Sequence, residues 1–178
     1  MKRLLKQGSL SLLVIAMIVV SRMVPHAPNI SPVLAIALFA GAYLENSWAI
    51  MSVFGALLLS DAMMGRFDFG IMAFVYGALL FIAIMGFALK GKVKVGNVIG
   101  SSLVSAVVFF VVTNFGVWAL PYSMYPHTLT GLYECFVLAV PFFWRTLAST
   151  LVSSVLLFGL YEAFRSILRS FKSDYIPA

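Results

Sequence analysis

The sequence predicts an all-α integral membrane protein, a bundle of six transmembrane helices in one membrane domain that covers residues 1–178. Of the 178 residues, 62% are hydrophobic and only 10% are charged, whereas an average soluble domain is about half apolar and a quarter charged. The apolar residues fall in long runs, and most basic residues lie between alternate runs. We therefore interpret the net charge of +6 as topology information and not as a nucleic-acid footprint.

Six segments approach the length of about 20 apolar residues that a spanning helix needs. The first follows a basic N-terminus without a small-residue cleavage pattern, so we interpret it as a retained helix and not as a signal peptide. The second is the shortest, and only Glu45 to Ser47 join it to the third, which predicts a tight hairpin. The expected spans are residues 8–24, 32–46, 47–64, 70–90, 96–120 and 146–168.

The basic residues predict the orientation of these spans. With six spans, nine Lys and Arg residues fall on one side and only Arg22, Arg66 and Arg145 on the other. Basic residues prefer cytoplasmic loops, so both termini should be cytoplasmic. We expect a multi-pass protein of the cytoplasmic (inner) membrane.

The apolar segment Gly131 to Phe143 is too short to span comfortably. If it spanned, the nine-to-three distribution would become seven to five and the orientation signal would largely vanish. We therefore expect a short interfacial or re-entrant helix between helices five and six, with Pro141 marking a break or kink near its end.

Small residues recur at intervals of four, which places each set on one helix face. Ala37 and Gly41 form such a pair in the second span, and Thr146, Thr150 and Ser154 form a polar ridge in the sixth. Close packing of helices in lipid relies on small residues. Helix–helix packing is the main interpretation of these positions, with contact to a partner subunit as the alternative.

One polar residue lies deep within the fifth span. Asn114 shares a helix face with Phe110 and Trp118 and is about a turn and a half from the outer end. A polar group at this depth needs a partner or a function, so Asn114 is a candidate for structural hydrogen bonding or for ligand contact.

The predicted outer face differs from the cytoplasmic one because it combines charged, aromatic and proline residues on short loops. Proline-rich connections are stiff, and polar or aromatic side chains on a rigid scaffold are typical of recognition sites. Three interpretations of Arg22 and Arg145 remain open. Each can extend toward the membrane interface, pair with Asp61 or Glu134, or bind an anionic group directly.

No enzyme motif stands out. The chain has no zinc-protease His-Glu-x-x-His, no Gly-x-Ser-x-Gly and no phosphate-binding Walker loop. His26 and His127 lie in different outer loops, and we expect neither a metal site nor a bound cofactor. A small membrane enzyme that uses His26, Asp61 and His127 is one alternative function, and a ligand-free accessory or scaffold subunit is another.

Several segments carry a family resemblance: RMVPHAPNISPVLAIALFAGAYL (22–44), LLLSDAMMG (57–65), VTNFGVWA (112–119), MYPHTLTGLYECF (124–136) and VPFFWRTLAST (140–150). Together they resemble the bacterial family of unknown function DUF6580, which is similar to the substrate-binding S components of energy-coupling factor transporters. One departure is Trp144-Arg145, which stands where the family pattern has Arg-Asn.

The resemblance implies a six-helix S-component fold whose outer loops and later helices enclose a vitamin or another micronutrient. It also implies an energising module, made of a membrane coupling subunit and two cytoplasmic ATPases. Such modules dock on small-residue helix faces, and Ala37 and Gly41 would replace the alanine-rich pattern that the first span lacks.

From these observations we expect a substrate-binding membrane subunit that captures a micronutrient from the outer side, with no catalysis of its own. The loop from Pro25 to Pro32 should form a wall or lid of the site. The candidate substrate-binding residues are Arg22, His26, Asn29, Asp61, Asn114, Trp118, Tyr125 and Arg145.

Overall fold

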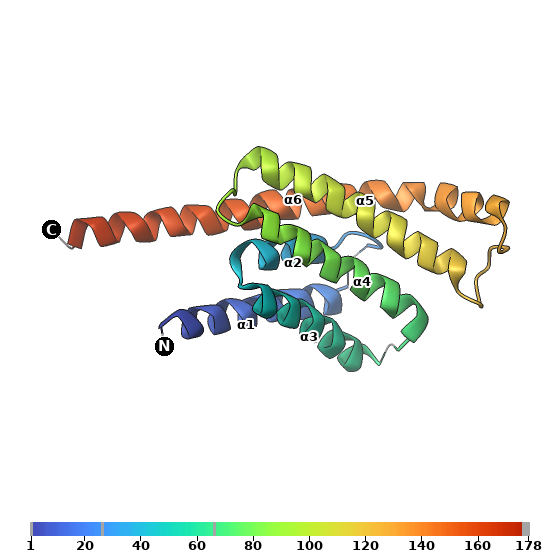
Figure 1. Cartoon of the computed structure of the whole chain (residues 1–178), viewed down its shortest axis with the longest axis horizontal. Coiled ribbons are helices and arrows are strands. Elements are labelled where there is room, and N and C mark those ends of the chain that lie inside the picture. Colours follow the sequence, from blue (N-terminus) through green and yellow to red (C-terminus); the bar gives the residue numbers. More distant parts are fainter. Residues whose placement is uncertain (1, 26, 66, 176–178) are drawn as a thin grey trace.

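The computed structural model describes residues 2–25, 27–65 and 67–175, and the side chains of residues 4–171 within these ranges. Neighbouring helices run in alternate directions, and the chain begins and ends at the same end of the bundle (Figure 1). The helices are α1 (Lys2–Met23), α2 (Val33–Tyr43), α3 (Asn46–Met64), α4 (Phe69–Gly86), α5 (Val95–Ala119) and α6 (Leu129–Tyr175), with a 3-10 turn η1 (Phe87–Leu89) after α4.

Five of these helices are long and apolar enough to cross a membrane, and α2 is a shorter apolar helix. The long helices leave most of their apolar surface outside the bundle: only 17% of the apolar window in α1 and 11% of that in α6 is buried. Apolar side chains on an outer surface suit a lipid environment. The chain is therefore a multi-pass membrane protein.

The short helix α2 lies at the centre of the bundle. Residues Val33 to Ala42 are all buried, and α2 lies against each of the other α-helices. It approaches α4 most closely where Gly41 faces Gly86, because a Cβ at Gly41 would lie 1.9 Å from the Ala83 carbonyl oxygen. Ala37 and Gly41 are thus packed inside the protein. The hypothesis that they dock an energising subunit is wrong for this conformation.

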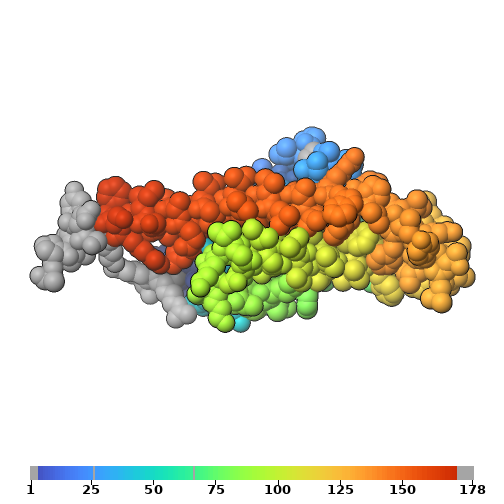
Figure 2. All heavy atoms as spheres, turned by 90° about the horizontal axis from the view of Figure 1, so that it is seen from above, coloured from blue at the N-terminus to red at the C-terminus, as the bar shows by residue number. Residues whose placement is uncertain are grey.

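The longest helix corrects a prediction. The expected interfacial helix between helices five and six does not exist as a separate element, since α6 runs without interruption from Leu129 to Tyr175 and contains Pro141. At 1.5 Å per residue a 47-residue helix is about 70 Å long. Figure 2 shows α6 as a continuous ridge with α5 beside it.

Local sequence explains several helix ends. Asp68 accepts hydrogen bonds from the backbone N–H groups of Gly70 and Ile71 and so caps the start of α4. Thr128 accepts a bond from the Gly131 N–H at the start of α6. Gly65 ends α3 in the left-handed conformation, with φ of 63°. Only Leu44 and Glu45 separate α2 from α3, which matches the predicted tight hairpin.

The contact between Gly41 and Gly86 generates the first prediction. Gly41→Ala should destabilise the protein by about 1–3 kcal/mol, because the new methyl group forces two packed backbones apart. Gly77 in α4 is the matched control, since a Cβ there meets nothing within 4 Å. Gly77→Ala should leave stability unchanged or raise it slightly. Thermal unfolding of both variants in detergent tests this, and equal melting temperatures would contradict it.

Candidate functional site

An ion pair between a partly buried arginine and a buried aspartate lies at the end of the bundle opposite the termini. Arg22, in the last turn of α1, donates from Nη2 to Oδ1 of Asp61 in α3 at 2.5 Å. The Tyr76 hydroxyl in α4 donates to Oδ2 of Asp61 at 2.6 Å. The Asp61 side chain is only 5% exposed. The structure thus realises the pairing that was one of the three interpretations of Arg22, and both Asp61 oxygens are occupied.

The pair does not use all the donors of Arg22. Its Nη1 is buried and has no hydrogen-bond partner among the described residues. A buried donor without an acceptor is unfavourable by about 1–3 kcal/mol, and a ligand can supply the missing acceptor. Arg22 lines a cavity of about 270 Å³, together with the polar residues Asn29, Ser31 and Thr146.

A second cavity of about 280 Å³ adjoins the first. The two share Asn29, Val75, Phe109 and Thr146 as lining residues. Asn114 lines the second cavity, and its side-chain amide uses one N–H to bond the Phe110 carbonyl oxygen at 2.7 Å. Its remaining N–H and its side-chain oxygen carry no further bond among the described residues.

The walls of the second cavity are mainly apolar, and two threonine hydroxyl groups in them can act as acceptors. Thr113 and Thr146 donate their hydroxyl protons to backbone carbonyls one turn earlier in their helices, at 2.7 and 3.2 Å. Their oxygens can still accept bonds from a ligand. The apolar lining includes four phenylalanines, Phe109, Phe110, Phe142 and Phe143.

Asn29 reaches both cavities from the connection between α1 and α2. It is the one described non-glycine residue with a positive φ, at 63°. Asparagine tolerates this left-handed conformation better than most residues, which allows the chain to turn sharply before Pro32. The connection between α1 and α2, which the sequence predicted to form a wall of the site, thus contributes Asn29 and Ser31 to the cavity lining.

The structure divides the candidate binding residues predicted from the sequence into those at the two cavities and those elsewhere. Arg22, Asn29 and Asn114 line the two cavities, and Asp61 holds Arg22 in place. Trp118 lies at the end of α5, donates to the Pro126 carbonyl oxygen at 3.0 Å and contacts the His127 ring edge-on.

The remaining candidates lie elsewhere. Tyr125 lies in the connection between α5 and α6 and borders neither cavity. Arg145 is exposed on α6, borders a separate apolar groove with Ile30 and Trp144, and makes no ion pair with Glu134 among the described residues. His26 lies outside the described residues.

Sequence reasoning missed part of the lining. Thr146 was assigned only to a packing ridge with Thr150 and Ser154. The structure buries Thr150 and Ser154 and joins Ser154 to Ser102 of α5 by a 2.8 Å hydrogen bond, whereas Thr146 borders the cavities. Within the part of the chain that the structure describes, His, Cys, Asp and Glu residues form no group of three that would suit a metal ion.

The connections at this end are tied together by the Asp68–Tyr122 hydrogen bond. The Tyr122 hydroxyl donates to the carboxylate that caps α4, and Gly70 packs against the same tyrosine. This bond, followed by the Ile71 N–H, lowers the pKa of Asp68 below its ordinary value. The loop before α4 is thereby fastened to the turn after α5.

These features define a class: an all-helical, multi-pass membrane protein with a partly polar double cavity near one end of the bundle. A profile of the family of unknown function DUF6580 matches residues 2–171, and the chain belongs to this family. Neither the curated proteins nor the solved structures gave a significant match to the chain.

The ion pair yields a second prediction. Asp61→Asn should destabilise the protein by about 3–5 kcal/mol, because it leaves the Arg22 charge buried without a counter-charge. Tyr76→Phe should cost about 1 kcal/mol, since it removes one neutral donor. Combining Asp61→Leu with Arg22→Met removes both charges, so the double variant should recover much of the stability that Asp61→Asn loses. Melting temperatures in detergent measure the series, and a double variant less stable than Asp61→Asn would contradict the assignment.

A third prediction concerns Asp68. Tyr122→Phe should raise the pKa of Asp68 toward the ordinary value of about 3.9, which carbonyl-detected NMR of the carboxyl group can follow. A depressed folded-state pKa stabilises the protein above the ordinary pKa, and this stabilisation is lost as the pH falls through the folded-state value. The melting-temperature advantage of the wild type over Tyr122→Phe should therefore shrink as the pH falls below about 4.

Proposed function

We propose that this protein is a substrate-binding membrane subunit that captures a vitamin-like or other micronutrient at the end of the bundle opposite the termini. The observation that carries the proposal is the buried Arg22 Nη1 at the edge of the adjoining cavities. Small-molecule sites are typically concave and mostly apolar, with a few polar groups that fix the orientation of the ligand.

The lining indicates what kind of molecule would fit. Because Asp61 already neutralises Arg22, the site favours a carbonyl or other acceptor on the ligand over a second full charge. Asn114 and Thr146 offer hydrogen bonds across the cavities, and the phenylalanines favour a flat or apolar body. The geometry favours binding over acid–base chemistry, since both Asp61 oxygens are already hydrogen-bonded.

The proposal includes a topology of six spans with both termini in the cytoplasm of a bacterium. It is supported by the two termini lying at the same end of the bundle (Figure 1) and by the nine basic residues that the sequence assigns to that end. In this topology α2 counts as a span in addition to the five long helices. Its short length is tolerated because the other helices surround it.

The proposal also includes an energising partner, as in the S components that the sequence resembles. A coupling subunit and two ATPases would supply the energy for uptake. Because Ala37 and Gly41 are buried against α4, the docking surface would have to lie on another helix face, such as the exposed apolar side of α1.

The fourth prediction tests the site. Purified full-length protein should show a higher melting temperature with at least one member of a panel of vitamins and corrinoids. Thr113→Val keeps the side-chain shape but removes an acceptor from the second cavity, so it should weaken that binding about fivefold to tenfold. Thr130→Val, at an exposed position on α6, is the matched control and should bind as the wild type does.

Two results would count against the proposal. One is a panel without any stabilising compound, together with the absence of a copurified small molecule in native mass spectrometry. The other is equal weakening by Thr113→Val and Thr130→Val, which would separate the binding from the cavity.

A further inference from the structure

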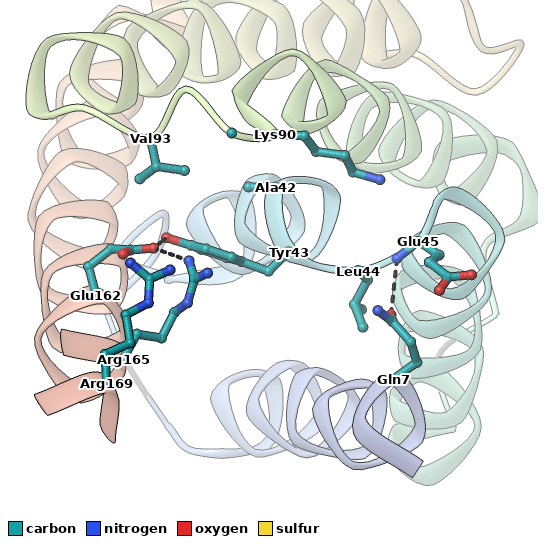
Figure 3. A pocket seen from close by; sticks show the side chains of 11 residues that line it. Gln7, Ala42, Tyr43, Leu44, Glu45, Lys90, Val93, Glu162, Arg165 and Arg169 are labelled. Carbon is teal, nitrogen blue, oxygen red and sulfur yellow. Dashed lines mark hydrogen bonds and ion pairs between the residues drawn. The ribbon is translucent and has the colours of Figure 1, made fainter. Parts of the chain in front are cut away.

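Another cavity, with a volume of about 580 Å³, lies at the other end of the bundle, where the termini are. It opens beyond the C-terminus of α2 and is bordered by α1, α6 and the connections that precede α3 and α5. Figure 3 shows side chains from all of these segments around it. Nothing in the proposed function uses this cavity.

Two arginines of α6 border the cavity from one side. Arg165 and Arg169 are four residues apart and share a helix face, and Figure 3 shows their guanidinium groups side by side. Arg165 donates from Nη1 to Oε1 of Glu162 at 2.7 Å. The same carboxylate oxygen accepts a 2.7 Å bond from the Tyr43 hydroxyl, so Glu162 is already shared.

The positive charge on this wall exceeds the negative charge. Arg169 makes no ion pair or hydrogen bond among the described residues, although its charge acts on Glu162. Of the two guanidinium groups, only that of Arg165 is therefore paired with a carboxylate. Glu45 lies across the cavity from them, near Lys90 (Figure 3). Basic residues near the end of a spanning helix are often no more than interface anchors, but an anchor does not require two guanidinium groups to lie side by side at a cavity.

Lys90 adds a third cation from the facing wall. Its ammonium group donates to the Asn46 side-chain oxygen at 2.7 Å and lies over the Phe87 ring, 4.7 Å from the ring centre. Burial lowers the pKa of Lys90. An anion in the cavity would favour the charged form of this lysine and balance the arginine pair.

We propose that this cavity is a binding site for a phosphate group, held by Arg165 and Arg169 and faced by Lys90. Guanidinium groups match the oxygens of phosphate in a bidentate arrangement. The three cations Arg165, Arg169 and Lys90 outnumber the two lining carboxylates, Glu162 and Glu45, so the cavity has a positive excess for an anion. The group can belong to a membrane lipid, because the cavity lies at the end of the spanning helices, or to a soluble phosphate compound.

The experiment uses the full-length protein, purified in detergent and stripped of lipid. Melting temperatures are recorded against rising inorganic phosphate and, separately, against phosphatidic acid in mixed micelles, all at constant ionic strength because salt screens such contacts. Both titrations yield an apparent Kd. Arg169→Gln should raise that Kd about tenfold, and Lys90→Gln should raise it severalfold. Lys92→Gln removes an exposed charge at the same end and should change it less than twofold.

Stabilisation by both probes would support a site for phosphate itself, and stabilisation by phosphatidic acid alone would support a lipid headgroup site. The proposal is overturned if neither probe stabilises the wild type, or if Lys92→Gln weakens binding as much as Arg169→Gln. If Arg169→Gln does not fold, Lys90→Gln against Lys92→Gln makes the same comparison. The vitamin panel probes the opposite end of the bundle, so either proposal can fail while the other stands.

Discussion

The close contact between α2 and α4 determines how the rest of the bundle is arranged. Gly41 and Gly86 allow the two backbones to meet, and α2 is thereby held at the centre with ten consecutive buried residues. At 1.5 Å per residue α2 extends only about 16 Å, roughly half of the 30 Å apolar core of a bilayer. A short helix surrounded by longer ones leaves space at both of its ends. Val33 and Leu34 border the cavity at its start, and Ala42 to Leu44 border the one at its end.

The two spaces differ in charge although they have the same geometric cause. At the start of α2, Asp61 balances Arg22 one to one, and Tyr76 completes the hydrogen bonding of the carboxylate. A buried pair of this kind contributes little net stability, but losing either partner is costly. At the end of α2, Arg165 pairs with Glu162, and Arg169 has no ion pair among the described residues. The first space therefore suits a largely neutral molecule, whereas the second suits an anion.

The sequence predicted those features that depend on local composition. Hydropathy located the long helices to within a few residues, except for the start of α1 and for α6. The sequence left structural bonding and ligand contact open for Asn114, and this residue both bonds the Phe110 carbonyl oxygen and lines a cavity. Charge counting indicated that Gly131 to Phe143 does not form a separate span, but it carries no information on whether a helix continues through Pro141. Trp118 shares a helix face with Asn114 but borders neither of the two adjoining cavities, and Arg145 borders a separate groove. Periodicity shows which residues share a helix face, and only packing decides what that face meets.

The solid centre of the bundle also constrains how a captured molecule could move. Ten buried residues of α2 separate the two cavities, and their contact with α4 leaves no room for even one methyl group at Gly41. A ligand cannot pass along the bundle axis unless this packing is broken. Tyr43 fixes the far end of α2 to α6 through Glu162, which opposes such an opening. For the uptake function proposed above, release on the opposite side of the membrane would require either an opening of this packing or a movement of the whole bundle relative to the bilayer.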